Sequence, residues 1–189
     1  MDVLGRSGRP EKETFTISPS GHFIIHYDTT DTDTTSPPNL TDNDGNRIPD
    51  YIDEVAIIAD SAHHVLVDIM GYTEAPFDGE GGYDIYIMSY AAGVYGYNYK
   101  DGSASYIQID NDYVGYNSKF DLTPIQIMQI TVGHEYFHGI QWGYEENLGV
   151  NSYFYEMTST WFEDILIPDG NDYLDGWIDE LLNNPTEDF

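Results

Sequence analysis

The chain has 189 residues and no Cys, and its 34 Asp and Glu against 6 Lys and Arg give a formal net charge of -28. A field this negative repels nucleic acid and anionic membranes, so we exclude both as partners. The length predicts a single domain over residues 1–189, monomeric and stable without disulfides. No apolar run reaches a membrane span, and no signal-peptide core is present. We expect Met1 to begin a trimmed sequence, so that any signal peptide, pro-segment or C-terminal domain would lie outside these residues.

The first part of the chain predicts an irregular segment followed by one strand. Residues 1–14 combine basic residues with little apolar content, and we expect them to form an irregular lead-in. Residues 22–27 are rich in strand formers and follow turn material at 18–21. His22 and His26 lie on one face of this strand, and we expect both to be packing or surface residues and not metal ligands.

Residues 42–53 have the oxygen spacing of an EF-hand calcium loop. This stretch resembles calcium loops of bacterial extracellular proteins, although Arg47 stands where Gly usually makes the sharp turn. An acidic helix N-terminus stabilised by the helix dipole is the alternative. The predicted calcium ligands are the side chains of Asp42, Asp44, Asn46, Asp50 and Asp53 and the backbone carbonyl of Ile48.

A long helix and several strands are predicted next. Residues 49–70 carry one apolar stripe and end at Gly71. His63 and His64 within this helix point about 100° apart, so they cannot form a helical metal pair. Residues 83–88, 93–99 and 105–109 read as strands, and we expect 105–109 to be an edge strand that pairs with extended substrate. The Tyr-rich stretch at 90–116 is expected to pack loops and line a cleft, with a carbohydrate-binding face as the alternative.

A buried helix is predicted from Pro124. Thr123 is a plausible N-cap, Pro124 suits the first helical position, and Gln126 can complete a capping box. Gly143 is the expected end. Apolar residues occupy all sides of this segment, as in a helix within the core.

This helix carries His134-Glu135-Tyr136-Phe137-His138, an H-E-x-x-H pattern. Residues four apart on a helix share one face, with Cβ atoms about 5–6 Å apart, so His134 and His138 can bind one zinc ion. Glu135 can reach a water at the open coordination position and take its proton. The pattern therefore predicts a catalytic zinc site.

A third protein ligand has to come from elsewhere, because Gln141 and Tyr144 replace the Gly and His of the metzincin pattern. Residues 151–164 read as a second helix that ends before Pro168. Glu156 is the expected ligand, since an unpaired carboxylate among its aromatic neighbours would be costly. Ser159, Thr160 and Glu163 lie on its face as partners for the ligand histidines. Glu145, Glu146 and Glu163 remain alternative ligands.

The run from His134 to Asp164 resembles the gluzincin peptidases, the thermolysin-like group of zinc enzymes. More narrowly, it is similar to a group of secreted bacterial metalloproteases. The resemblance implies zinc at His134, His138 and Glu156, Glu135 as general base, and an extracellular location. Thr160 stands where thermolysin has an Asp that orients the first His, so either Thr160 or Glu163 must take that role.

The element order predicts an α+β, zincin-like domain with a mixed twisted sheet packed on the H-E-x-x-H helix. The expected function is a zinc endopeptidase acting on protein or peptide substrate, because the acidic anchor of an aminopeptidase is absent. The alternative is a calcium-stabilised extracellular binding or adhesion module with a non-catalytic metal site. Tyr144, Tyr153 and Tyr155 are the tyrosines nearest in sequence for stabilising an oxyanion. A short last helix is expected at 173–182.

Overall fold

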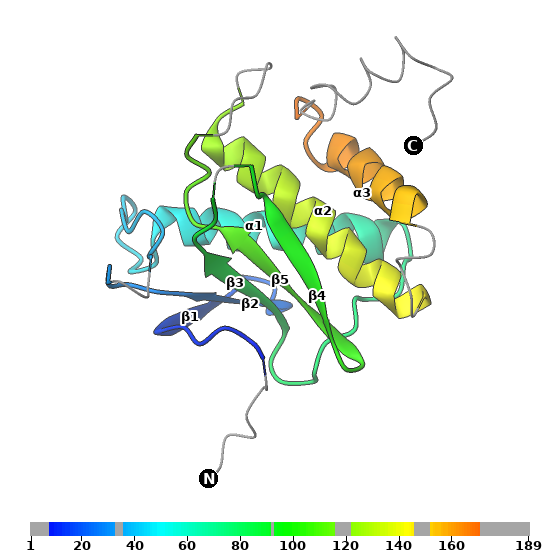
Figure 1. Cartoon of the computed structure of the whole chain (residues 1–189), viewed down its shortest axis with the longest axis horizontal. Helices are drawn as coiled ribbons and strands as arrows, with labels where there is room; N and C mark the ends of the chain where they lie inside the picture. Colours follow the sequence, from blue (N-terminus) through cyan, green and yellow to red (C-terminus); the bar gives the residue numbers. More distant parts are fainter. Residues whose placement is uncertain (1–7, 33–35, 92, 116–121, 146–151, 171–189) are drawn as a thin grey trace.

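The computed structural model describes residues 8–32, 36–91, 93–115, 122–145 and 152–170 (Figure 1). The helix expected at 173–182, Glu146 and Asn151 lie outside these residues. Five strands, three α-helices and one π-helical segment occur in the described part of the chain. In order they are β1 (Thr14–Ile17), β2 (Phe23–Tyr27), α1 (Asp50–His63), η1 (His64–Ile69), β3 (Tyr83–Met88), β4 (Gly96–Asp101), β5 (Ala104–Asp110), α2 (Pro124–Tyr144) and α3 (Ser152–Leu166).

The strands form one mixed sheet in the order β1-β2-β3-β5-β4. The outer pairs, β1 with β2 and β4 with β5, are antiparallel. The inner pairs, β2 with β3 and β3 with β5, are parallel. The expected α+β class and mixed sheet are therefore confirmed.

The prediction that 105–109 is an edge strand is wrong. β5 lies between β3 and β4, and all seven of its residues are buried. Its alternation of Tyr106, Ile107, Gln108 and Ile109 suggested one exposed face, but Tyr106 stacks on Tyr99 with ring centroids 5.4 Å apart. Among the described strands, the edge on this side is β4, where half-buried and exposed residues alternate over most of the strand.

Residues 8–13 have no regular secondary structure, as expected of the lead-in, and residues 1–7 lie outside the described part of the chain. Thr14 begins β1, a strand that the sequence did not indicate. Arg9 is buried against the sheet face opposite the helices, where it pairs with Asp84 and, at 2.8 Å, with Asp101. Its guanidinium also lies 4.9 Å from the ring centroid of Tyr106. A buried cation needs such partners, and these contacts fasten the segment to β3, β4 and β5.

Helices α1 and α2 pack on the other face of the sheet, and α3 lies against α2 (Figure 1). Their shared core contains alternate residues of three neighbouring strands, such as Ile25, Ile85 and Ile107. Val55 of α1 and Met128 of α2 are fully buried in the same cluster. The continuous apolar surface of α2 is thus explained, because the sheet, α1 and α3 surround it.

The ends of α2 are close to those expected. The Thr123–Gln126 capping box is present, with Pro124 in the first turn, and the helix ends one residue after Gly143. The first long helix differs in its second half, because α1 gives way to η1 at His64. Gly71 ends that segment with a φ of 80°, a left-handed conformation that suits glycine.

Candidate metal centre

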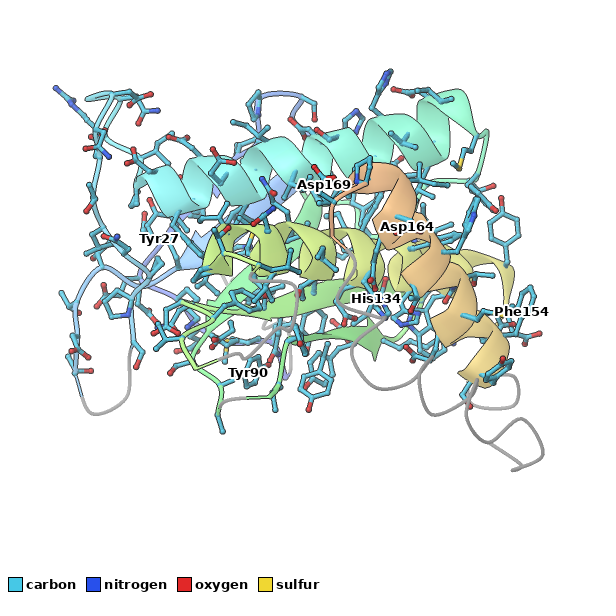
Figure 2. The ribbon with its side chains drawn as sticks, turned by 90° about the horizontal axis from the view of Figure 1, so that it is seen from above. Tyr27, Tyr90, His134, Phe154, Asp164 and Asp169 are labelled. Carbon is cyan, nitrogen blue, oxygen red and sulfur yellow. The ribbon has the colours of Figure 1, made fainter. Side chains whose placement is uncertain are left out.

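His134 and His138 lie on the side of α2 that faces α3, with ring centroids 4.7 Å apart. Glu156 of α3 points its carboxylate at both rings, with Oε2 3.2 Å from His134 Nε2 and Oε1 3.5 Å from His138 Nε2. Figure 2 shows His134 between the two helices. The three residues that the sequence pairs as zinc ligands are therefore brought together, with donor atoms within 4.8 Å of one another.

These distances suit a small tetrahedral ion. Bonds of about 2.0–2.2 Å at tetrahedral angles place neighbouring donor atoms roughly 3.3–3.5 Å apart. The separations of Glu156 from the two imidazoles fall at that value or slightly below it. Two imidazole nitrogens and one carboxylate are also a donor set that zinc takes in catalytic sites.

The second nitrogen of each ring is held by a neighbouring side chain. His134 Nδ1 donates to Glu163 Oε1 at 2.5 Å, and His138 Nδ1 donates to Gln141 Oε1 at 2.7 Å. This leaves both Nε2 atoms as the ones directed at Glu156. Such contacts fix the tautomer and ring orientation of metal-binding histidines. Of the two residues considered for orienting His134, Glu163 makes the contact.

Gln141 was not expected to take part in the site. Its Nε2 donates to the backbone oxygen of Tyr155 at 3.1 Å and to Thr158 Oγ1 at 3.0 Å. Ser159 Oγ lies 3.3 Å from His138 Nδ1. Gln141 therefore joins His138 to α3. Its position three residues after His138, on the same helix face, was the available signal, although the same residue also marks the departure from the metzincin pattern.

Glu135 is 8% exposed, and its carboxylate has a different environment from that of Glu156. Burial raises the pKa of Glu135, and the nearby imidazoles of His134 and His138 partly oppose this rise. The backbone oxygen of Glu135 accepts a hydrogen bond of 2.8 Å from Asn98 Nδ2, which fastens this turn of α2 to β4. The backbone that carries this buried carboxylate is thus held against the sheet.

The charges of the site are coupled. Hydrogen bonds from His134 and His138 hold the pKa of Glu156 well below its usual range. Burial lowers the pKa of His134, but the carboxylates of Glu156 and Glu163 outweigh it and raise that pKa to about 10. In the absence of a metal ion, a proton on His134 therefore balances the acidic groups, and an incoming cation would displace it.

A cavity of about 300 Å³ opens beside His134. Glu135 lines it from α2 and Glu163 lines it from α3. Tyr97 of β4 and Tyr95, the residue before β4, line it from the sheet. Tyr144, one of the tyrosines nearest in sequence, instead bonds Thr73, whose backbone nitrogen lies 2.8 Å from its hydroxyl. Tyr95 and Tyr97 are thus closer to the candidate site than sequence proximity indicated.

The other candidates for third ligand are placed differently. Glu163 already accepts the hydrogen bond from His134 Nδ1. Glu145 is exposed at the end of α2 and does not belong to a cluster of possible ligands in the described part of the chain. Glu146 lies outside the described residues. Glu156 is the acidic residue that approaches both Nε2 atoms.

The predicted calcium loop folds back on its own carboxylates. Asp42 accepts hydrogen bonds from the backbone nitrogens of Gly45 and Arg47, at 2.7 and 2.9 Å. Asp44 Oδ1 accepts from the backbone nitrogen of Asn46, and Asn46 Nδ2 donates to Asp53 Oδ2 at 2.9 Å. Arg47 has a φ of 74°, so it takes the left-handed turn usually made by Gly. Among the described residues, the carboxylates of the 42–53 loop do not form a convergent group of three, so calcium binding there remains a prediction.

In comparisons with protein-family models, curated proteins and solved structures, none matched this chain. Within the described residues, no helix has both the length and the apolar character needed to cross a bilayer.

Proposed function

We propose that the chain is a zinc-dependent metalloendopeptidase with a zincin-like, gluzincin-type domain. The observation that carries the proposal is the cluster of two Nε2 atoms and the Glu156 carboxylate, with both Nδ1 atoms held by Glu163 and Gln141. A structural zinc site is normally closed by four protein ligands, whereas three here leave a position beside a cavity. The resemblance to secreted bacterial proteases supports action outside the cell.

When bound, zinc would supply a Lewis acid that polarises a carbonyl and lowers the pKa of a water molecule. Glu135 follows the first ligand and lines the cavity, so its carboxylate can accept a proton as water attacks the peptide carbonyl carbon. The same carboxyl group then delivers that proton to the leaving amine as the C–N bond breaks. Asn98 and the surrounding core hold this part of α2 during both transfers.

An extended peptide is the substrate that the surroundings of the site favour. β4 forms one edge of the sheet and reaches the cavity through Gly96 and Tyr97. An edge strand offers unpaired backbone groups, which an extended chain can pair with by β-augmentation. A peptide bound along β4 would pass the cavity that contains Glu135. We therefore place the substrate on β4 and not on the central strand β5.

The test is to separate catalysis from metal binding. Glu135→Gln keeps the side-chain shape but cannot accept the proton, so casein cleavage should fall by at least about two orders of magnitude. Zinc content should stay near one ion per chain at this site, whereas Glu156→Gln should lose that ion. The matched control is Glu145→Gln, which changes an exposed glutamate just after the end of α2. This variant should change neither casein cleavage nor zinc content.

A wild-type protein that binds zinc but cleaves no peptide, with no change in Glu135→Gln, would contradict the peptidase proposal. That result would favour the calcium-stabilised binding or adhesion module.

A further inference from the structure

A second group of possible metal ligands lies away from the H-E-x-x-H site. It consists of His22, the residue before β2, His63 at the end of α1 and Glu74 in the connection to β3. Their ligand atoms lie within 4.8 Å of one another. Nothing in the sequence indicates this group, because its members are far apart in the chain. His22, expected to be a packing or surface residue, lies in a group that could hold a metal ion.

His63 presents a buried nitrogen with no hydrogen-bond partner. The side chain is 6% exposed, and Nε2 forms no hydrogen bond within the described structure. This atom lies 3.5 Å from Glu74 Oε1, so it is directed into the cluster. Buried polar atoms are almost always paired, and an unpaired one calls for an explanation such as an absent ion.

The remaining distances also suit an ion. Glu74 Oε1 lies 3.5 Å from His22 Nδ1 as well, so one carboxylate oxygen is equally far from both histidines. Donor atoms around a tetrahedral zinc ion lie roughly 3.3–3.5 Å apart. The donor set of two imidazoles and one carboxylate suits zinc and neighbouring transition metals better than calcium or magnesium.

The surroundings hold one ligand firmly and leave the others adjustable. Phe23 and Tyr136 pack against the ring of His63, with centroids 6.3 and 6.2 Å away. His22 stacks on His63 with centroids 3.8 Å apart, but its side chain is 43% exposed. The nitrogen lone pairs of two stacked rings point in nearly parallel directions. The ring of His22 must therefore rotate before His22 and His63 can bind the same ion. Its exposure allows that rotation without repacking the core.

We propose that His22, His63 and Glu74 form a second transition-metal site, which binds zinc and joins α1, β2 and the segment before β3. The site is separate from the centre formed by His134, His138 and Glu156, and it does not depend on the peptidase proposal. The expected effect of this ion is on stability, since a metal that binds only the folded chain stabilises it.

The experiment counts zinc ions in the purified full chain after chelation and titration with zinc alone. The His138→Ala variant, which disables the first centre, should bind one ion per chain, and zinc should raise its melting temperature. His138→Ala combined with His22→Ala should bind none and show no such rise. His138→Ala combined with His64→Ala is the matched control, because His64 is 64% exposed and lies outside the cluster.

Glu74→Gln in the His138→Ala background provides a second variant with an exposed, shape-conserving change. Loss of the ion there supports the three-ligand site, even if a histidine variant folds poorly. Retention of one ion in either the His22 or the Glu74 variant would overturn the proposal. Binding of no ion by His138→Ala itself would also overturn it, whatever the wild type binds at its first centre.

Discussion

His134 Nδ1 and Glu163 Oε1 are 2.5 Å apart, a short hydrogen bond between α2 and α3. Glu163 is almost fully buried, and it contacts the ring on the side away from Glu156. One turn of α3 therefore supplies a candidate ligand and a later turn supplies the group that orients the first histidine. The packing of the two helices determines the geometry of the site.

We predict that Glu163→Gln weakens zinc binding by about 10–100-fold, the usual cost of removing a partner of a metal-bound histidine. The amide of Gln still fills the space of the carboxylate. It carries no negative charge, so it stabilises the proton on His134 Nδ1 less well. Competition titration with a chelator of known affinity measures the change. Asp169→Asn, at an exposed position labelled in Figure 2, removes the same charge and should leave zinc affinity unchanged.

Local patterns predicted α2 well because its signals lie within a few residues of one another. The Thr123 cap, Pro124 and the His134–His138 spacing all depend on one helical turn, and the structure has the helix where they indicate it. The placement of Glu156 opposite the histidines depends on the contact between α2 and α3. Glu156 could be predicted because the metal needs a third ligand, but the sequence does not decide between Glu163 and Thr160 as the residue that orients His134.

Features set by long-range packing were missed. The position of β5 between β3 and β4 depends on strand order, which the alternation within one strand does not contain. Arg9 is buried because acidic residues of β3 and β4 surround it. His22 and Glu74 meet His63 only once β2 and the segment before β3 have packed beside α1. Periodicity predicts which residues share a face, but it does not show which distant elements meet.

The calcium loop leads to a prediction about stability. Calcium should raise the melting temperature of the wild type, because a ligand that binds the folded state alone stabilises it by mass action. Asp44→Ala should abolish the rise, since it removes one proposed ligand. Asp31→Ala, an exposed acidic residue outside the loop, should keep the full effect. Equal rises in the Asp44 and Asp31 variants would place the calcium elsewhere.

Gly133 allows α2 and α3 to approach closely beside His134. A Cβ at this position would lie 2.5 Å from Leu166 Cδ2, with Phe162 next to it. Gly133→Ala should therefore cost about 1–3 kcal/mol through overpacking, offset by up to about 1 kcal/mol from the better helix propensity of Ala, so that the fold is destabilised by up to about 2 kcal/mol. It should also lower zinc affinity, because α3 carries Glu156 and Glu163. Chemical denaturation and zinc titration measure the two effects.

Two further variants distinguish the close contact from ordinary helix propensity. Gly143 lies in the same helix, but the nearest atom to its added Cβ is 3.6 Å away, so Gly143→Ala should stabilise the helix by up to about 1 kcal/mol. Leu166→Ala combined with Gly133→Ala should recover part of the lost zinc affinity, because the two side chains occupy one space. Absence of any recovery would show that the Leu166 contact does not cause the loss.

The edge position of β4 predicts a period of two in the backbone contacts of a substrate. In an antiparallel pair, hydrogen-bonded and non-hydrogen-bonded positions alternate, so alternate amides of a bound peptide would donate to β4. Replacing one amide by an ester removes a donor and costs about 0.5–1.5 kcal/mol, which corresponds to roughly 2–12-fold in kcat/KM. Esters at alternate positions should show this loss, and esters at the intervening positions should not. Tyr97→Ala should change the preference for substrate side chains while leaving the alternation in place, because it alters the cavity wall and not the strand backbone. A uniform response along the peptide, or none, would show that the substrate does not extend the sheet at β4.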